Sequence, residues 1–546
     1  MRRAVWLFAV ACAPTPAPDV PPAMSAHDLL VRASLDVRGA RPSVTELDRV
    51  AADPDAVDDM VADMLRDPRF PGRVRQLWSE VFRTQVDGFM VIASDVQLDD
   101  EAAWVRSGGE EPLRILEEVA RADLPWTTLV TGDWTMADSV LAGVASVALD
   151  AAPDGDEGWV RAHYTDGRPA AGVLATMGWN LRYTSTLSNM NRGRANAAAR
   201  VFLCQDFLSQ PIDFAGGVDL RDPERVARAI AEDPSCVACH RTLDPLASHF
   251  YGFWAQDSFD PAEALRYHPE RERTWRNVSG VAPGYFGSPR TGRLDLLGRD
   301  LASDPRFARC AVDTAWSLLV RAVPARADED ALIVVRERFV TGGGTPRALV
   351  AAVLDTSAYR AGPTATTGAP RKLVTPDLLA DQVEDLTGFR WTRDGADLLA
   401  IDAVGVEEKR EDRGAAWTGF RTLAGGADGD TVVTSATLPS VPLLLVQARL
   451  AEGAASFAVG RAAAGGSALS LFGDIDVASV PTREDAARAV QGLYLRVLSR
   501  RVDVDAPEVT ELLALWDAAH AIRQDPREAW TTVLTALLRD PSFLVY

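Results

Sequence analysis

Several residue types and patterns are scarce in this 546-residue chain, and each scarcity excludes a class of protein. Five cysteines are too few to build a disulfide-rich scaffold. No run of about 18 consecutive apolar residues occurs, so the sequence predicts no helix that spans a membrane. The 57 Lys and Arg residues are outnumbered by 77 Asp and Glu. The resulting net charge of -20 would repel a phosphate backbone, and nucleic-acid binding is therefore not expected.

Motifs of the common enzyme classes are also missing. We find no Ser-His-Asp nucleophile elbow, no Walker loop and no dinucleotide-binding fingerprint. What remains is an ordinary globular composition, with 47% hydrophobic and 25% charged residues. At roughly 150 residues per domain, the length predicts three or four structural units.

The N-terminus has the pattern of an export signal. Arg2 and Arg3 precede an apolar stretch at residues 4–11, and the small and apolar residues directly before Cys12 resemble a bacterial lipobox. We therefore expect a signal peptide with lipobox at 1–12, lipidation of Cys12, and a Pro-rich tether at 13–24. A plain cleaved signal peptide or a buried N-terminal segment are the alternatives. The predicted location is the bacterial cell envelope, lipid-anchored and facing the periplasm or the cell surface.

Helical periodicity dominates the rest of the chain, and one pattern recurs weakly along it. Each copy has an apolar helix, an Arg-containing turn, an acidic helix start and a second apolar helix that closes on Asp-Pro-x-Phe or a weaker form. The copies cover residues 29–70, 317–359 and 492–543. We expect a mainly α fold built from helical repeat units, in which the Asp67-Pro68 and Asp540-Pro541 steps end helices.

Compositional breaks divide this helical pattern. They predict an N-terminal helical domain, a helical repeat domain, a linker and a C-terminal helical domain, at 25–150, 290–360, 361–372 and 373–546 respectively. Minor β content is expected in the C-terminal region, where Thr431–Ser435 could form a strand. The acidic stretch Asp150–Gly158 matches no EF-hand spacing and is interpreted as a solvated loop.

One short motif carries specific chemistry. Cys236, Cys239 and His240 form a CxxCH sequence, which is the attachment signature for c-type haem. On a helix, residues i and i+3 share a face, so both thiols can reach one porphyrin. His240 can then bind the haem iron from the proximal side. The alternatives are a redox-active or structural disulfide between the two cysteines, or a zinc site completed by a distant ligand.

The second axial ligand is not evident from the sequence. All methionines precede the motif, so the ligand common in small c-type cytochromes is missing downstream of it. The candidates are Met177, Met190 and His163 upstream, and His249, His268 and His520 downstream. A five-coordinate iron with an open position is the alternative. The Asp244-Pro245 step predicts a turn or a helix end, and a carbonyl group near Pro245 could accept the Nδ1–H of His240.

These residues resemble a known group of proteins. Residues 236–245, CVACHRTLDP, are similar to the haem-binding segment of the planctomycete-type cytochrome c families, which have related exported proteins in myxobacteria. Residues 191–196, 201–204 and 307–321 are similar to the flanking stretches. The match also touches the start of the chain, GFRTLAGGADGD and the final ALLRDPSF. At 249–252, His-Phe-Tyr-Gly departs from the expected apolar or aromatic-Arg stretch. The resemblance implies a cytochrome-c-like segment at 170–270, between the helical units, and a covalent haem c.

Two further cysteines flank this segment. Cys204 and Cys310 lie in amphipathic helical sequence and would meet an oxidising compartment after export. A disulfide between them would tie two helices together, and two buried free thiols are the alternative. A Cα separation above about 7 Å would rule the disulfide out.

Taken with the export signal, the motif predicts a c-type haem lipoprotein that transfers electrons in the cell envelope to a redox partner that the sequence does not identify. The first alternative is a haem redox enzyme with an open axial site and an unknown substrate. The second is a helical scaffold lipoprotein without haem.

Overall fold

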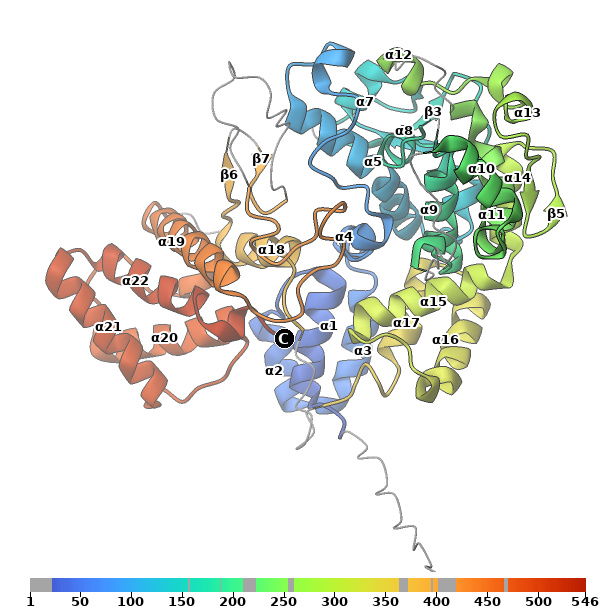
Figure 1. The fold of residues 1–546 in the computed structure, drawn as a ribbon. Coiled ribbons are helices and arrows are strands. Elements are labelled where there is room, and N and C mark those ends of the chain that lie inside the picture. The colour runs from blue at the N-terminus through green and yellow to red at the C-terminus, as the bar shows by residue number, and fades with distance from the viewer. Residues whose placement is uncertain are drawn as a thin grey trace, which may run out of the picture.

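The computed structural model describes residues 22–155, 158–186, 188–209, 222–253, 260–362, 372–393, 396–400, 419–465 and 470–546. The fold is mainly α, with 60% helix and 5% strand (Figure 1). The predicted signal peptide, Cys12 and most of the predicted tether and linker lie outside the described residues.

The first part of the chain builds a helical layer and a small sheet. Its helices are α1 (Ala26–Arg38), α2 (Val44–Ala52), α3 (Val57–Met64), α4 (Phe70–Phe82), α5 (Glu101–Arg121), α6 (Thr128–Thr131), α7 (Ser139–Val144), α8 (Met177–Arg182) and α9 (Arg192–Leu203). Its strands are β1 (Thr135–Ala137), β2 (Val147–Leu149) and β3 (Val160–Tyr164), which pair antiparallel in the order β1-β3-β2. The described residues of the acidic stretch, 150–155 and 158, lie between β2 and β3 and belong to no helix or strand.

The middle of the chain carries the CxxCH motif. Its helices are α10 (Pro223–Glu232), α11 (Pro234–Ala247), α12 (Pro261–Ala264), α13 (Trp275–Val278), α14 (Leu294–Ser303), α15 (Pro305–Val320), α16 (Glu329–Thr341) and α17 (Pro346–Leu354). Strands β4 (Gly284–Tyr285) and β5 (Ser288–Pro289) form a short hairpin beside α11.

The C-terminal part forms a separate helical group in Figure 1. Its helices are α18 (Pro376–Thr387), α19 (Val441–Ala463), α20 (Arg483–Leu498), α21 (Pro507–Arg523) and α22 (Pro526–Leu538), and its short strands are β6 (Thr392–Arg393) and β7 (Ala396–Asp397). The predicted strand at 431–435 is wrong. That segment is an irregular turn, because the Asp428 side chain accepts hydrogen bonds from the backbone N–H groups of Asp430, Thr431 and Val432.

The Asp-Pro steps predicted to end helices, at residues 67–68 and 540–541, follow the ends of α3 at Met64 and of α22 at Leu538. Other Asp-Pro steps begin helices. The aspartate is the N-cap and accepts a backbone N–H two residues later, while proline occupies the first turn, where it loses no intrahelical hydrogen bond. This arrangement starts α10, α11, α15 and α22, with Asp222, Asp233, Asp304 and Asp525 as the caps.

The three segments with the recurring sequence pattern share one local feature. In each, the first helix ends at a residue in the left-handed conformation, and two further helices follow. These residues are Gly39 after α1, Arg321 after α15 and Ser499 after α20, with φ of 72°, 62° and 54°. A left-handed C-cap lets the backbone close the last helical turn and reverse direction. Thr345 caps α17, and Pro346 is its first residue.

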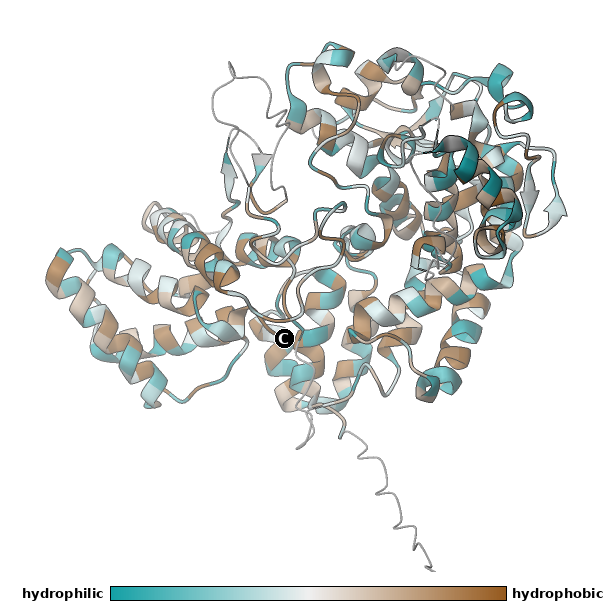
Figure 2. Cartoon of the chain, in the orientation of Figure 1, coloured by the Kyte–Doolittle hydropathy of each residue, from teal (hydrophilic) through white to brown (hydrophobic). Residues whose placement is uncertain are grey.

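Two large hydrophobic cores hold the fold together. One takes side chains from Leu29 to Tyr359, and the other takes side chains from Leu373 to Leu544 together with Leu35 of α1. A smaller core lies between α5 and the three-stranded sheet. Figure 2 shows that most helices carry both apolar and polar residues, as expected of helices with one buried face. Because Leu29 belongs to the first large core and Leu35 to the second, helix α1 contributes to both.

A buried polar cluster links the same two parts of the chain. Asp36 of α1 forms an ion pair with Lys372, and each of these side chains is 1% exposed. The hydroxyl groups of Tyr359 and Tyr546 donate to the Asp36 carboxylate at 2.8 and 2.9 Å. Burial raises the pKa of Asp36, but the nearby charges of Lys372 and Arg32 outweigh burial and hold this pKa below its usual range.

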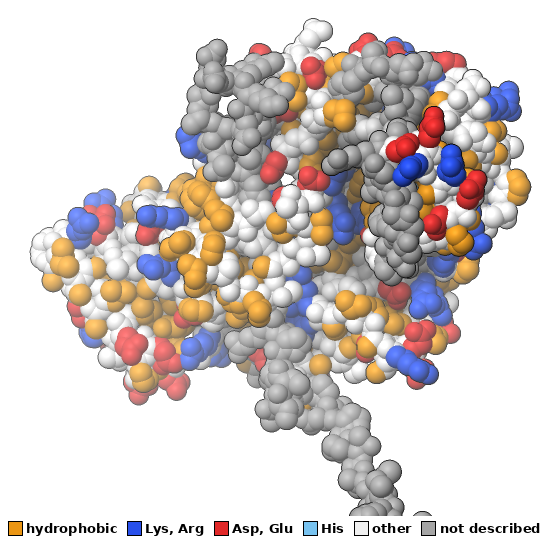
Figure 3. Space-filling model, in the orientation of Figure 1, with side chains coloured by type: hydrophobic (Ala, Val, Ile, Leu, Met, Phe, Trp, Pro, Cys, Tyr) orange, Lys and Arg blue, Asp and Glu red, His pale blue; other side chains and the backbone are white. Residues whose placement is uncertain are grey.

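Helix α19 is the one helix in the described part of the chain that is long and apolar enough to cross a membrane. Half of its apolar window is buried, and it packs against α22 and α18, as core helices of soluble proteins also do. Figure 3 shows apolar side chains gathered over this helix. The exposed members on α19 include Val441, Leu444, Leu445 and Phe457.

Candidate functional site

Helix α11 presents the residues of the CxxCH motif. Asp233 caps the helix, because its carboxylate accepts the backbone N–H of Ser235 at 2.9 Å. Cys236 and Cys239 follow one turn apart, and both are half-buried free thiols. Cys239 also packs against the larger N-terminal core. The two sulfur atoms therefore lie on the same side of a surface helix, as the spacing predicts.

His240 is oriented by a carboxylate one turn further along the helix. Its Nδ1 lies 3.0 Å from Oδ1 of Asp244, whereas its Nε2 has no hydrogen bond within the described residues. Arg192 at the start of α9 forms a bidentate ion pair with the same carboxylate, with Nε–Oδ1 and Nη2–Oδ2 distances of 2.6 and 3.0 Å. An imidazole that donates Nδ1–H to a carboxylate exposes Nε2 as a ligand of fixed direction.

The Asp244 carboxylate stays charged in this setting. Its side chain is 8% exposed, and burial alone raises its pKa. The hydrogen bond with His240 and the Arg192 guanidinium outweigh burial, so the pKa of Asp244 lies below its usual range. A negative charge is thus held behind the imidazole ring at ordinary pH.

Two sequence-based expectations about this segment are wrong. Helix α11 continues through Pro245 to Ala247 and then tightens into a 3-10 turn, so the Asp244-Pro245 step is no helix end. The acceptor for His240 is the Asp244 side chain and not a carbonyl near Pro245. The His-x-x-x-Asp spacing places both side chains on one helix face and could have revealed the pair. The Arg192–Asp244 contact spans 52 positions, so no local spacing in the sequence indicates it.

The surface beside the thiols is incompletely covered. None of the described side chains of α10 is buried, although Val226, Ala229 and Ile230 lie on one face of this helix at i, i+3, i+4 spacing. The first two turns of α11, which carry both cysteines, also have no buried residue, and burial begins at Leu243. The α10–α11 pair thus presents partly covered apolar residues beside two free thiols and an oriented imidazole. This combination fits the attachment of a large apolar group.

Three of the six candidates for the second axial position are engaged elsewhere in the fold. Met177 is buried in the core beside the sheet, and His249 is buried with its Nδ1 3.1 Å from the Arg293 carbonyl oxygen. Both nitrogen atoms of His268 have partners, in Glu270 and the Glu263 backbone.

The remaining candidates differ in their surroundings. His163 on β3 contacts the Asp133 carbonyl oxygen and the Asp150 carboxylate, and His520 stacks on Trp516 in the C-terminal helical group. Met190 is half-buried and lies two residues before Arg192, which contacts the α11 site. Of the six candidates, Met190 is thus the closest in sequence to a residue of the Asp244 cluster.

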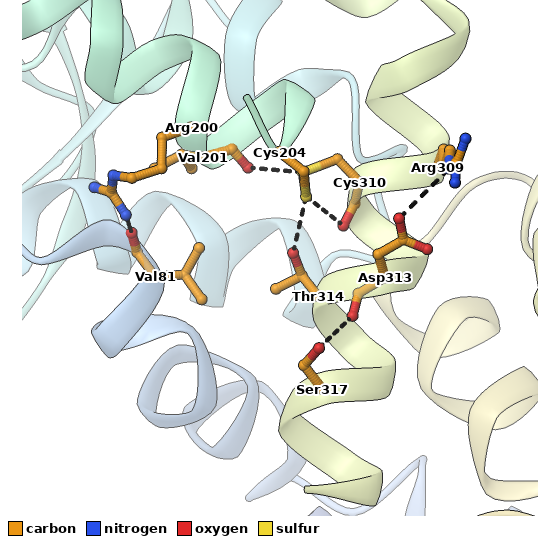
Figure 4. The surroundings of a disulfide bond; sticks show 9 residues. All are labelled: Val81, Arg200, Val201, Cys204, Arg309, Cys310, Asp313, Thr314 and Ser317. Atoms are coloured by element: carbon orange, nitrogen blue, oxygen red, sulfur yellow. Dashed lines mark hydrogen bonds and ion pairs between the residues drawn. A yellow bond between two sulfur atoms is a disulfide. The ribbon is translucent and has the colours of Figure 1, made fainter. Parts of the chain in front are cut away.

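A disulfide closes a loop that contains the CxxCH helix. Cys204 and Cys310 are bonded, with a Cα–Cα distance of 5.2 Å and a sequence separation of 106 residues. Figure 4 shows that the bond joins the end of α9 to α15. Cys310 is buried and Cys204 is exposed. The closed loop contains α10, α11 and α14, so the helices around the CxxCH motif are tied at both ends.

The alternative chemistries of the motif obtain no support from this geometry. Cys236 and Cys239 are not bonded to each other. In the part of the chain that the structure describes, no group of three or more His, Cys, Asp and Glu side chains could hold a metal ion, so the four-ligand zinc site is not built there. A c-type haem needs a single protein ligand to its iron besides the two thioether bonds, and these residues provide that set.

Comparison with known proteins adds no family assignment, since no family model, no curated protein and no solved structure matches this chain.

Proposed function

We propose that this protein is an exported c-type haem lipoprotein that transfers electrons in the bacterial cell envelope. The observation that carries the proposal is the His240–Asp244 hydrogen bond of 3.0 Å. It leaves Nε2 of His240 unpartnered, directly after the second of two free thiols. A haem bound there would supply a one-electron couple at its iron. Cys236 and Cys239 would hold it covalently, and His240 would be its proximal ligand.

The role of the protein groups follows from their positions. Asp244 orients the imidazole and holds negative charge behind it, and Arg192 fixes the carboxylate from α9. Such hydrogen bonding to a ligating histidine tunes the electron density at a metal. The site lies on a surface helix pair whose thiols are half-buried, and this suits exchange of electrons with a partner protein.

Haem attachment is tested by producing the full chain together with a c-type maturation system. We expect a haem-stained band and an intact mass increased by one tetrapyrrole for the wild type, and neither for Cys236→Ser/Cys239→Ser. Cys204→Ser/Cys310→Ser is the matched control, because it removes the same number of thiols outside the motif and should still stain. A colourless wild type with no added tetrapyrrole would overturn the proposal.

The role of Asp244 is tested by its reduction potential. Asp244→Asn removes the negative charge behind His240 but retains a hydrogen-bond acceptor, and we expect a higher potential because the oxidised iron loses stabilisation. Asp233→Asn is the control, since Asn also caps helices and the residue lies at the far end of α11. Equal potentials for the wild type and Asp244→Asn would refute the assignment of His240 as the iron ligand.

A haem redox enzyme with an open axial site is the second candidate. It is favoured by the engagement of His249, His268 and Met177 elsewhere in the fold. A high-spin ferric spectrum and ready cyanide binding would support the enzyme, and a low-spin spectrum would support the electron carrier. Conversion of a low-spin wild type to high spin by Met190→Ala would assign Met190 as the second ligand.

Membrane attachment through Cys12 belongs to the same proposal. Labelling with a palmitate analogue should mark the wild type and not Cys12→Ser. Equal labelling of both proteins would contradict the lipid anchor.

We also propose that α1–α3, α15–α17 and α20–α22 are copies of one three-helix unit. The support is the left-handed residue that ends the first helix of each group, together with the recurring sequence pattern. The copies would then frame the cytochrome-c-like segment.

A further inference from the structure

A cavity of about 560 Å³ lies away from the CxxCH motif. It is lined by α1, by the turn that follows α20, and by the segments around residues 361 and 545. Small-molecule sites in proteins typically have volumes of roughly 300–1,000 Å³, so this cavity is large enough for an organic ligand. Its lining combines apolar side chains with several cations.

Arg41 lines this cavity and is a buried cation without a counter-ion. The residue is 7% exposed, and no carboxylate in the described part of the chain pairs with it. Its Nη2 lies 3.5 Å from the Phe543 carbonyl oxygen, at the limit of a hydrogen bond, and its guanidinium carbon lies 5.2 Å from the Phe543 ring. Its Nε has no hydrogen-bond partner. Burial lowers the pKa of Arg41 to about 10. Such a group is costly unless an anion meets it.

Two more buried donors without partners belong to the same lining. Arg32 is 5% exposed and its Nε has no hydrogen-bond partner, while its Nη2 donates to the Leu319 carbonyl oxygen at 3.3 Å. Ser499 is 2% exposed and its hydroxyl group is also unpartnered. Three residues on one cavity thus retain unused hydrogen-bonding capacity, although buried polar groups in proteins are nearly always paired.

The other arginines of the lining already act on carboxylates, since the charge of Arg32 acts on Asp36. Arg500 pairs with Glu508 at 2.5 Å, and Arg501 pairs with Asp48. Asp28, the one acidic residue in the lining, is exposed and accepts a hydrogen bond from Ser25. The unmet charge is therefore concentrated at Arg41. Apolar side chains complete the lining, among them Val31, Leu498 and Val545.

We propose that this cavity binds an organic anion, with a carboxylate or phosphate head held by Arg41, Arg32 and Ser499 and an apolar body against the aliphatic lining. Guanidinium groups bind both kinds of oxyanion through paired, charge-assisted hydrogen bonds. The site uses no residue of the CxxCH helix, so it is independent of haem binding.

Calorimetric titration of the full chain tests the proposal with four probes: octanoate, octyl phosphate, octanol and inorganic phosphate. We expect octanoate or octyl phosphate to bind at least tenfold more tightly than octanol and inorganic phosphate, and the tighter of the two identifies the head group. The proposal is overturned if neither octyl anion binds. It is also overturned if octanol or inorganic phosphate binds as tightly as the better octyl anion.

Variants locate the bound anion. Arg41→Met should weaken binding of the octyl anion at least tenfold, whereas Arg449→Met, on the exposed surface of α19, should leave it unchanged. Without ligand, Arg41→Met should melt no lower than the wild type, because it removes an uncompensated buried charge. A clearly lower melting temperature would instead indicate a purely structural arginine. Ser499→Ala keeps the packing and Arg41→Lys keeps the charge, and each should weaken binding of the octyl anion. Unchanged affinity in both variants would also contradict the proposal.

Discussion

The disulfide between Cys204 and Cys310 provides a quantitative test of the fold around the site. The bond spans 106 residues. In the chain-entropy model, a cross-link that closes a loop of about 100 residues stabilises the folded state by about 4.7 kcal/mol at 25 °C. Reduction of this bond alone should therefore lower the free energy of unfolding by about 4 to 5 kcal/mol.

The measurement needs a background in which no other pair of thiols can react. In Cys236→Ser/Cys239→Ser, urea unfolding followed by tryptophan fluorescence is compared with and without a reductant. Cys204→Ala/Cys310→Ala in the same background should resemble the reduced protein and should not respond to reductant. Equal stability of the oxidised and reduced proteins would show that the unfolded chain gains no freedom from reduction, and the reasoning from loop closure would fail.

Two further changes probe buried charges. Lys372→Met should lower the free energy of unfolding by about 3 kcal/mol, because it leaves the Asp36 carboxylate buried without its main counter-ion. Adding Asp36→Asn to this variant should restore most of the loss. Denaturant titration measures both effects, and simple additivity of the two changes would show that the residues are not coupled. Because the pKa of Asp244 is lowered, its stabilising contribution is full above its ordinary value of 3.8 and is lost as the pH falls through the lower folded-state pKa. The wild type and Asp244→Asn should therefore approach each other in stability in acid, and a gap that persists at the lowest pH would contradict the assigned pKa.

The helical class of this fold follows directly from local sequence. Periodic apolar positions and the Thr345-Pro346 start are properties of neighbouring residues, which a single sequence displays. The three-stranded sheet was not expected, because β1, β2 and β3 have at most five residues each and gain stability from packing on α5. At Thr431–Ser435, β-branched residues suggested a strand, but the Asp428 side chain satisfies the local backbone instead.

The site could be predicted in part for the same reason. Cys236, Cys239 and His240 are recognisable because their chemistry depends on short spacing along one helix. The Arg192 contact joins residues 52 positions apart, so only the packing of α9 on α11 brings it to Asp244. The cavity at Arg41 combines residues from both ends of the described chain, and no local pattern marks it.

The long span of the Cys204–Cys310 bond also bears on how the chain would be oxidised if it is exported as proposed. Cys236 and Cys239 are separated by three positions, so by chain statistics alone they meet roughly two orders of magnitude more often in an unfolded chain than two cysteines 106 positions apart. Random oxidation would therefore join the neighbours first and, in the proposed haem protein, block the thiols that haem attachment uses. Maturation of that protein would then need thiol exchange that reopens this early bond while folding brings α9 and α15 together.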